Sequence, residues 1–119
     1  MYKLLIMCLL LIGQNVMANE VQIVNVKMHN NDGDEYRVDV TLLHGDTGWD
    51  HYADGWEILD KNKKVIAQRI LGHPHVNEQP FTRSLYRAKI SQHEKLIYIR
   101  AHDKVHGYSE LYKINLNKQ

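Results

Sequence analysis

Histidine is the residue type through which this sequence could carry out chemistry. The 119-residue chain holds eight histidines, and six of them share three polar segments with five carboxylates. Imidazole and carboxylate groups together suit transition metals such as Zn(II) and Cu(II). The six histidines and five carboxylates are His44, His51, His73, His75, His102, His106, Asp46, Asp50, Asp54, Glu78 and Asp103.

The spacing of these histidines indicates how they could share one metal ion. His73 and His75 are two residues apart, so in an extended segment stiffened by Pro74 both rings point to the same side. His102 and His106 bracket a loop and converge if it turns back. We expect a copper or zinc site with three histidines and an open or carboxylate-filled fourth position. Its expected ligands are His44, His73, His75, His102 and His106.

The other polar residues of these segments are expected to support that site. A carboxylate that accepts a hydrogen bond from a metal-bound imidazole fixes the orientation of the ring. No spacing here matches an established zinc motif such as His-Glu-x-x-His, so the prediction depends on the three segments meeting. The expected supporting residues or alternative ligands are Asp46, Asp50, His51, Asp54, Glu78 and Asp103.

The elements that must bring these segments together are predicted to be β-strands. Apolar residues recur with a period of two, as in Tyr36, Val38, Val40 and Leu42, rather than with the helical period. About seven short strands separated by turn signals predict an all-β fold, an antiparallel β-sandwich of immunoglobulin or fibronectin type III character. A small barrel is the alternative. The expected strands cover residues 21–28, 36–42, 56–59, 64–71, 81–90, 96–101 and 111–116.

The order of these strands predicts which loops meet. In an up-and-down run of antiparallel strands, alternate connections lie at the same end of the sandwich. The polar connections over residues 44–55, 72–80 and 102–109 are alternate ones. We therefore expect them to gather six imidazoles and five carboxylates at one end.

Other interpretations of the same loops remain open. The histidines and aspartates could form a hydrogen-bonded network that holds the loops rigid without a metal. The loops could instead act as an adaptor that recognises a protein or glycan, with Trp49, Tyr52 and Tyr108 as contacts. Trp56 is expected in the core, and Trp49 is the better candidate for exposure. An enzyme is less favoured, because no nucleophile motif is visible and so small a domain leaves little room for a deep pocket.

The first eighteen residues are predicted to be a secretory signal peptide. Lys3 precedes the short apolar run 4–12, and small residues surround a cleavage site near Ala18. Such a run is too short to span a bilayer. Cleavage leaves a single periplasmic or secreted domain, residues 19–119. A lipoprotein signal at Cys8 is the alternative, but the preceding methionine is larger than the residue expected there.

The composition excludes several classes of protein. A hydrophobic fraction of 44% and a charged fraction of 24% are typical of one globular domain. The formal net charge of +1 provides no electrostatic footprint for nucleic acid. No second hydrophobic segment follows the signal peptide, so we expect a protein that does not span a membrane.

Three stretches of the sequence carry a resemblance. They read HGDTGWDHYAD at residues 44–54, HPHVNEQPFTRS at residues 73–84 and HDKVHGY at residues 102–108. Together they resemble a family of small exported bacterial proteins that has no assigned activity. The resemblance implies one compact exported domain and supplies no catalytic residue. The functional prediction therefore depends on the histidine geometry.

Overall fold

The structure of the protein is a computed structural model, and the residues that it describes are 20–116. The predicted signal peptide, residues 1–18, lies outside the described residues. Within residues 20–116 no helix is long and apolar enough to cross a membrane. The described chain forms β1 (Gln22–Asp32), β2 (Glu35–Leu43), β3 (Ala53–Leu59), β4 (Val65–Ile70), β5 (Phe81–Lys89), β6 (Leu96–Asp103), β7 (Gly107–Tyr108) and β8 (Tyr112–Asn115).

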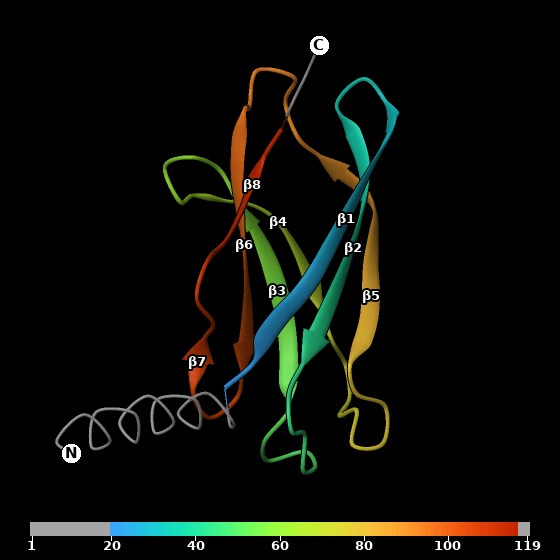
Figure 1. The fold of residues 1–119 in the computed structure, drawn as a ribbon, viewed down its shortest axis with the longest axis vertical. Coiled ribbons are helices and arrows are strands. Elements are labelled where there is room, and N and C mark those ends of the chain that lie inside the picture. Colours follow the sequence, from blue (N-terminus) through green and yellow to red (C-terminus); the bar gives the residue numbers. More distant parts are fainter. Residues whose placement is uncertain (1–19, 117–119) are drawn as a thin grey trace, which may run out of the picture.

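These strands form two antiparallel sheets, arranged as two layers in Figure 1. One sheet has the order β1-β2-β5, and the other has the order β4-β3-β6-β7, with β8 also paired to β6. The predicted all-β sandwich of antiparallel strands is confirmed at this level. The structure adds to the seven expected strands an eighth, the two-residue strand β7.

Alternating apolar side chains from both sheets fill the space between the layers. In β6, Ile97, Ile99 and Ala101 are buried, while the residues between them are only half-buried. Trp56 of β3 is 1% exposed, which confirms its predicted place in the core. Because burying one large apolar side chain contributes about 1.5–3 kcal/mol, this alternation stabilises the face-to-face arrangement.

The three polar connections do lie at one end of the molecule. They are residues 44–52, 71–80 and 104–106, and they occupy the lower end of Figure 1. We refer to this region as the loop end. The prediction that the three histidine-rich connections share one end of the sandwich is therefore confirmed.

Two of these connections are shorter than the sequence predicts. β3 begins at Ala53 rather than at Trp56, and β6 continues to Asp103 rather than ending at Ala101. Ala53 and Asp103 pair in the same ladder, so backbone hydrogen bonding extends both strands beyond their apolar runs. Because successive strand residues face opposite sides, Asp103 points into the sandwich and His102 points outward.

Candidate metal centre

His44 is a buried histidine at the start of the first loop. It directly follows β2, and its side chain is fully enclosed. Its backbone N–H donates to Gln79 Oε1 at 2.9 Å, which ties it to the 71–80 loop. Its ring Nδ1 is hydrogen-bonded to Asp46 Oδ1. A carboxylate on Nδ1 fixes the ring and leaves Nε2 as the nitrogen that a metal could use.

Asp46 joins three separate segments of the loop end. Besides His44, its Oδ1 accepts a hydrogen bond from the Ala53 backbone N–H at 3.1 Å. Its Oδ2 accepts one from the His75 backbone N–H at 2.7 Å. The carboxylate is fully buried, so these bonds replace its lost hydration and hold the two longer loops together.

Two further possible metal ligands lie beside His44. Its Nε2 lies 3.2 Å from His51 Nε2 and 3.3 Å from Asp103 Oδ2. The distance from His51 Nε2 to Asp103 Oδ1 is 3.6 Å. Among residues 20–116, these three side chains form a group in which one ligand atom from each lies within 4.8 Å of the others. We call this set the histidine–aspartate group.

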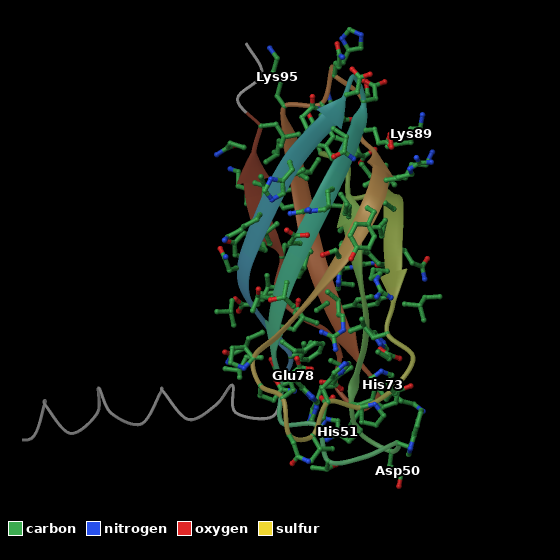
Figure 2. The ribbon with its side chains drawn as sticks, turned by 90° about the vertical axis from the view of Figure 1, so that its right-hand side faces the viewer. Asp50, His51, His73, Glu78, Lys89 and Lys95 are labelled. Carbon is green, nitrogen blue, oxygen red and sulfur yellow. The ribbon has the colours of Figure 1, made fainter. Side chains whose placement is uncertain are left out.

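His51 reaches this group from a tight turn in the first loop. The backbone N–H of Thr47 donates to the His51 carbonyl at 3.1 Å, and the His51 N–H donates to the Gly48 carbonyl at 3.2 Å. These two bonds fold the loop back, so its histidine ring is directed toward the sandwich. Figure 2 shows His51 among the loops, while Asp50 lies at their outer tip.

Asp103 enters the group as a buried carboxylate. Its Oδ1 accepts hydrogen bonds from the backbone N–H groups of Val105 and His106 at 2.7 and 2.5 Å. Burial alone raises the pKa of this carboxyl, but those N–H donors and the neighbouring imidazoles hold the pKa below its usual value. The side chain is therefore an ionised ligand at neutral pH.

The second carboxylate oxygen, Asp103 Oδ2, has no hydrogen-bond donor in the group. It is buried and accepts no hydrogen bond within the described part of the chain. In the tautomer of His44 that donates its Nδ1–H to Asp46, the Nε2 lone pair faces this oxygen and the Nε2 of His51. A single proton can bridge one pair of these atoms, whereas a metal ion between them satisfies all three.

His106 stands next to the group without being part of it. Its Nδ1 lies 3.4 Å from Asp103 Oδ2, and its ring centroid lies 5.0 Å from that of His51. The β6–β7 turn positions it, with Gly107 at a positive φ of 82°, which glycine adopts readily. Its side chain is about one-third exposed.

His73 and His75 occupy a different part of the loop end. Their ring centroids are 4.6 Å apart, so the two rings lie beside each other. His75 is buried, stacks on Phe81 at 4.0 Å, and has its Nε2 2.9 Å from an Arg83 guanidinium nitrogen. Burial lowers the pKa of His75, and the charge of Arg83 lowers it further. The lowered pKa favours a neutral ring, whose Nε2 is taken by Arg83 while its Nδ1 is buried without a partner among the described residues. Neither histidine joins the histidine–aspartate group.

His102 faces the outer surface of the five-stranded sheet. Its Nδ1 is 2.6 Å from Asp54 Oδ1, and both side chains are partly exposed. The pair borders a surface hollow of about 280 Å³ that Tyr108 also lines. The structure therefore separates His102 from the other predicted ligands, because its neighbour Asp103 takes the inward position.

The three aromatic residues predicted as contacts differ in exposure. Trp49 is 63% exposed and Tyr108 is 53% exposed. Tyr52 is buried, since Trp49 packs edge-on against it and Lys104 lies over its ring. Tyr52 consequently presents no free ring to a partner. Glu78 is exposed and pairs with Arg83 at 3.2 Å.

Two residues outside the predicted site, Gln79 and Arg83, also organise the loop end. Gln79 accepts from the His44 backbone and donates to the His75 carbonyl at 2.8 Å. Arg83 contacts both His75 and Glu78. Neither residue belongs to a type that the search for metal ligands considers. Their position in the second histidine-rich stretch is the signal that could have found them.

Comparison with known proteins gives one distant similarity. The chain is 34% identical over 89 residues to a protein of the archaeon Halomicrobium mukohataei described as "Putative lipoprotein". The aligned part is 75% of this chain but 43% of that protein, so this chain spans less than half the length of the curated relative it matches. No family model matches the chain. No solved structure matches it either.

Proposed function

We propose that this protein binds one divalent transition metal ion, zinc or copper(II), at the histidine–aspartate group. His44 Nε2, His51 Nε2 and the Asp103 carboxylate are the ligands. Asp46 is the residue that orients His44. Both metals accept imidazole and carboxylate ligands, and the first loop together with the end of β6 would hold the ion at the end of the sandwich.

The spacing of the ligand atoms is the observation that carries this proposal. In a tetrahedral zinc site, metal–nitrogen bonds of about 2.0–2.1 Å place neighbouring ligand atoms about 3.3–3.4 Å apart. Here the two Nε2 atoms are 3.2 Å apart, and the nearest Asp103 oxygen lies 3.3 Å from His44 Nε2 (Oδ2) and 3.6 Å from His51 Nε2 (Oδ1). A hydrogen-bonded network explains this geometry less well, because it leaves Asp103 Oδ2 buried without a donor.

The wider setting of the proposal is an exported protein. We infer cleavage near Ala18 and release of residues 19–119 as one domain into the periplasm or medium. The relative's description as a lipoprotein supports export. Membership of a family of small exported bacterial proteins remains a prediction. The sheet orders β1-β2-β5 and β4-β3-β6-β8 support the immunoglobulin or fibronectin type III character proposed for the sandwich.

Metal analysis of the native protein tests the proposal directly. The chain is expressed with its own signal region and without a histidine tag, and the purified protein is analysed by elemental mass spectrometry. Metal-free protein is then titrated with Zn²⁺ and with Cu²⁺ by calorimetry. We expect one ion per chain for the physiological metal.

A matched pair of histidine variants locates the site. His51→Ala removes a partly exposed ligand, so the fold should persist, which circular dichroism can verify. We expect its metal affinity to fall at least about 100-fold, since even residues that only orient a ligand contribute about 10–100-fold. His93→Ala, in the exposed turn at the opposite end, should bind as tightly as the wild type. Equal affinities in the two variants would overturn the proposal.

Exposure of Trp49 favours a second candidate, an adaptor that recognises a protein or glycan. A ring that is 63% exposed at a loop tip is available for stacking. Tryptophan fluorescence during titration with soluble cell-wall fragments tests this function, because Trp56 is buried and reports little. A shift that disappears in Trp49→Phe would support the adaptor, and a constant spectrum would count against it.

A further inference from the structure

The histidine–aspartate group has one side that faces solvent, and we propose that a metal ion held there binds a small anionic ligand from solution on that side. This inference rests on the proposed metal function and extends it. Within residues 20–116, three side chains meet the distance requirement of the group. Three protein ligands leave a tetrahedral ion one ligand short, as in catalytic zinc sites and unlike structural ones.

The difference in burial between the ligands identifies the open side. The side chains of His44 and Asp103 are fully buried, and their remaining polar atoms are bonded to Asp46 and to backbone N–H groups. His51 is 20% exposed. Access to the ion is therefore closed from the interior and open beside His51.

His106 borders this open side and is the protein side chain that could itself provide the fourth ligand. Its Nδ1 is 3.4 Å from Asp103 Oδ2, within the range of neighbouring ligand atoms. It is nevertheless outside the set whose ligand atoms all lie within 4.8 Å of one another. We therefore assign His106 to the wall of the position that the external ligand occupies.

The charge of the centre favours an anion there. Two neutral imidazoles and one carboxylate neutralise only part of the charge of a divalent ion, so the metal retains net positive charge toward solvent. Bound cations are often the largest local charge in a site and attract anionic ligands. A halide, azide, hydroxide or the carboxylate of a small molecule has the required chemistry.

Cobalt substitution with azide as the probe tests this proposal. Co²⁺ is added to the metal-free full-length protein, and the visible absorption is recorded during titration with sodium azide. We expect a saturable shift of the Co²⁺ bands, because azide enters the coordination sphere. His106→Ala should bind Co²⁺ and show the same azide-dependent shift, since His106 only borders the position.

The possible failures are distinguishable from one another. One-to-one Co²⁺ binding with a spectrum that azide leaves unchanged would overturn the open position and leave the metal site intact. Azide sensitivity that appears only in His106→Ala would also overturn it, because His106 would then be the fourth ligand. Absence of Co²⁺, Zn²⁺ and Cu²⁺ binding would overturn the proposed function itself. His102→Ala, on the outer sheet face, serves as the control that should match the wild type throughout.

Discussion

His102 and Asp103 are adjacent on β6, but they belong to two histidine–carboxylate groups with opposite surroundings. His102 pairs with Asp54 on the outer face of the sheet, where both side chains are partly exposed. Asp103 meets His44 inside the loop end, where both side chains are fully enclosed. The outer pair is one hydrogen bond between two partners. The inner group brings two imidazoles to one carboxylate and leaves a buried oxygen without a donor.

The two groups contain the same residue types, so what sets the candidate metal site apart from the surface pair is its burial and its unmatched hydrogen-bonding atom. An exposed histidine–carboxylate pair is solvated and contributes on the order of 0–1 kcal/mol. A buried carboxylate without a donor costs free energy unless a cation or proton compensates for it. A metal ion bound to the inner group, as proposed, would supply that compensation.

The largest expected effect comes from removing the charge of Asp103. Asp103→Asn keeps the oxygen that accepts the two backbone N–H bonds, and its new amide can donate to His44 Nε2. We expect the metal-free protein to be at least as stable as the wild type by denaturant unfolding. Metal affinity should fall at least about 100-fold, because an anionic ligand is lost. Calorimetric titration and unfolding curves provide the two measurements.

Asp54→Asn is the matched variant for the outer pair. It should lower stability by no more than about 1 kcal/mol and leave metal affinity unchanged, since the pair is partly exposed. The proposed difference between the inner group and the outer pair would be contradicted if Asp103→Asn strongly destabilised the metal-free protein and the wild type bound no metal. The inner group would then be a structural network like the outer pair.

A smaller effect is expected at Asp46, which orients His44 but is not one of the proposed metal ligands. Asp46→Asn puts an amide N–H against one of the backbone N–H groups or against His44 Nδ1. An unmatched buried polar group costs about 1–3 kcal/mol, so unfolding should show a loss of about 2 kcal/mol. Metal affinity should fall about 10–100-fold. Asp50→Asn at the exposed loop tip should change neither quantity, and an equal response of both variants would contradict the orienting role.

Most of the fold could be predicted from the sequence, because a period of two reports directly which strand residues face a core. The apolar alternation in β2 and β6 and the positions of the turns identified all seven longer strands. The strand ends were less predictable. Residues 53–55 and 102–103 carry mostly polar or small side chains, so pattern alone assigns them to loops. Backbone pairing of Ala53 with Asp103, which is long-range, extends both strands.

The candidate site was predictable as a region but not as a set of ligands. Strand order brings the three histidine-rich loops together, which sequence can indicate. Which nitrogen meets which oxygen depends on side-chain direction within a few ångströms. His102 and Asp103 are adjacent residues of one strand, so their side chains face opposite sides of the sheet. Asp103 therefore lies in the group and His102 lies outside it. His51, expected as a supporting residue, also lies in the group, whereas His73 and His75 do not.

The smallest expected effect concerns His75, a histidine of the second loop whose ring lies outside the histidine–aspartate group. Burial lowers its pKa below the usual value of 6.5, and Arg83 and His73 lower it further. A depressed pKa means that the unfolded chain binds the proton more readily, so stability is lost as the pH falls below 6.5 toward the folded value. Unfolding of metal-free protein between about pH 7 and about pH 5 should show this decrease, and His75→Gln should flatten it. If His75 were protonated and paired with a carboxylate instead, the variant would steepen the decrease. His93→Gln, in the exposed turn at the other end of the sandwich, is the matched control.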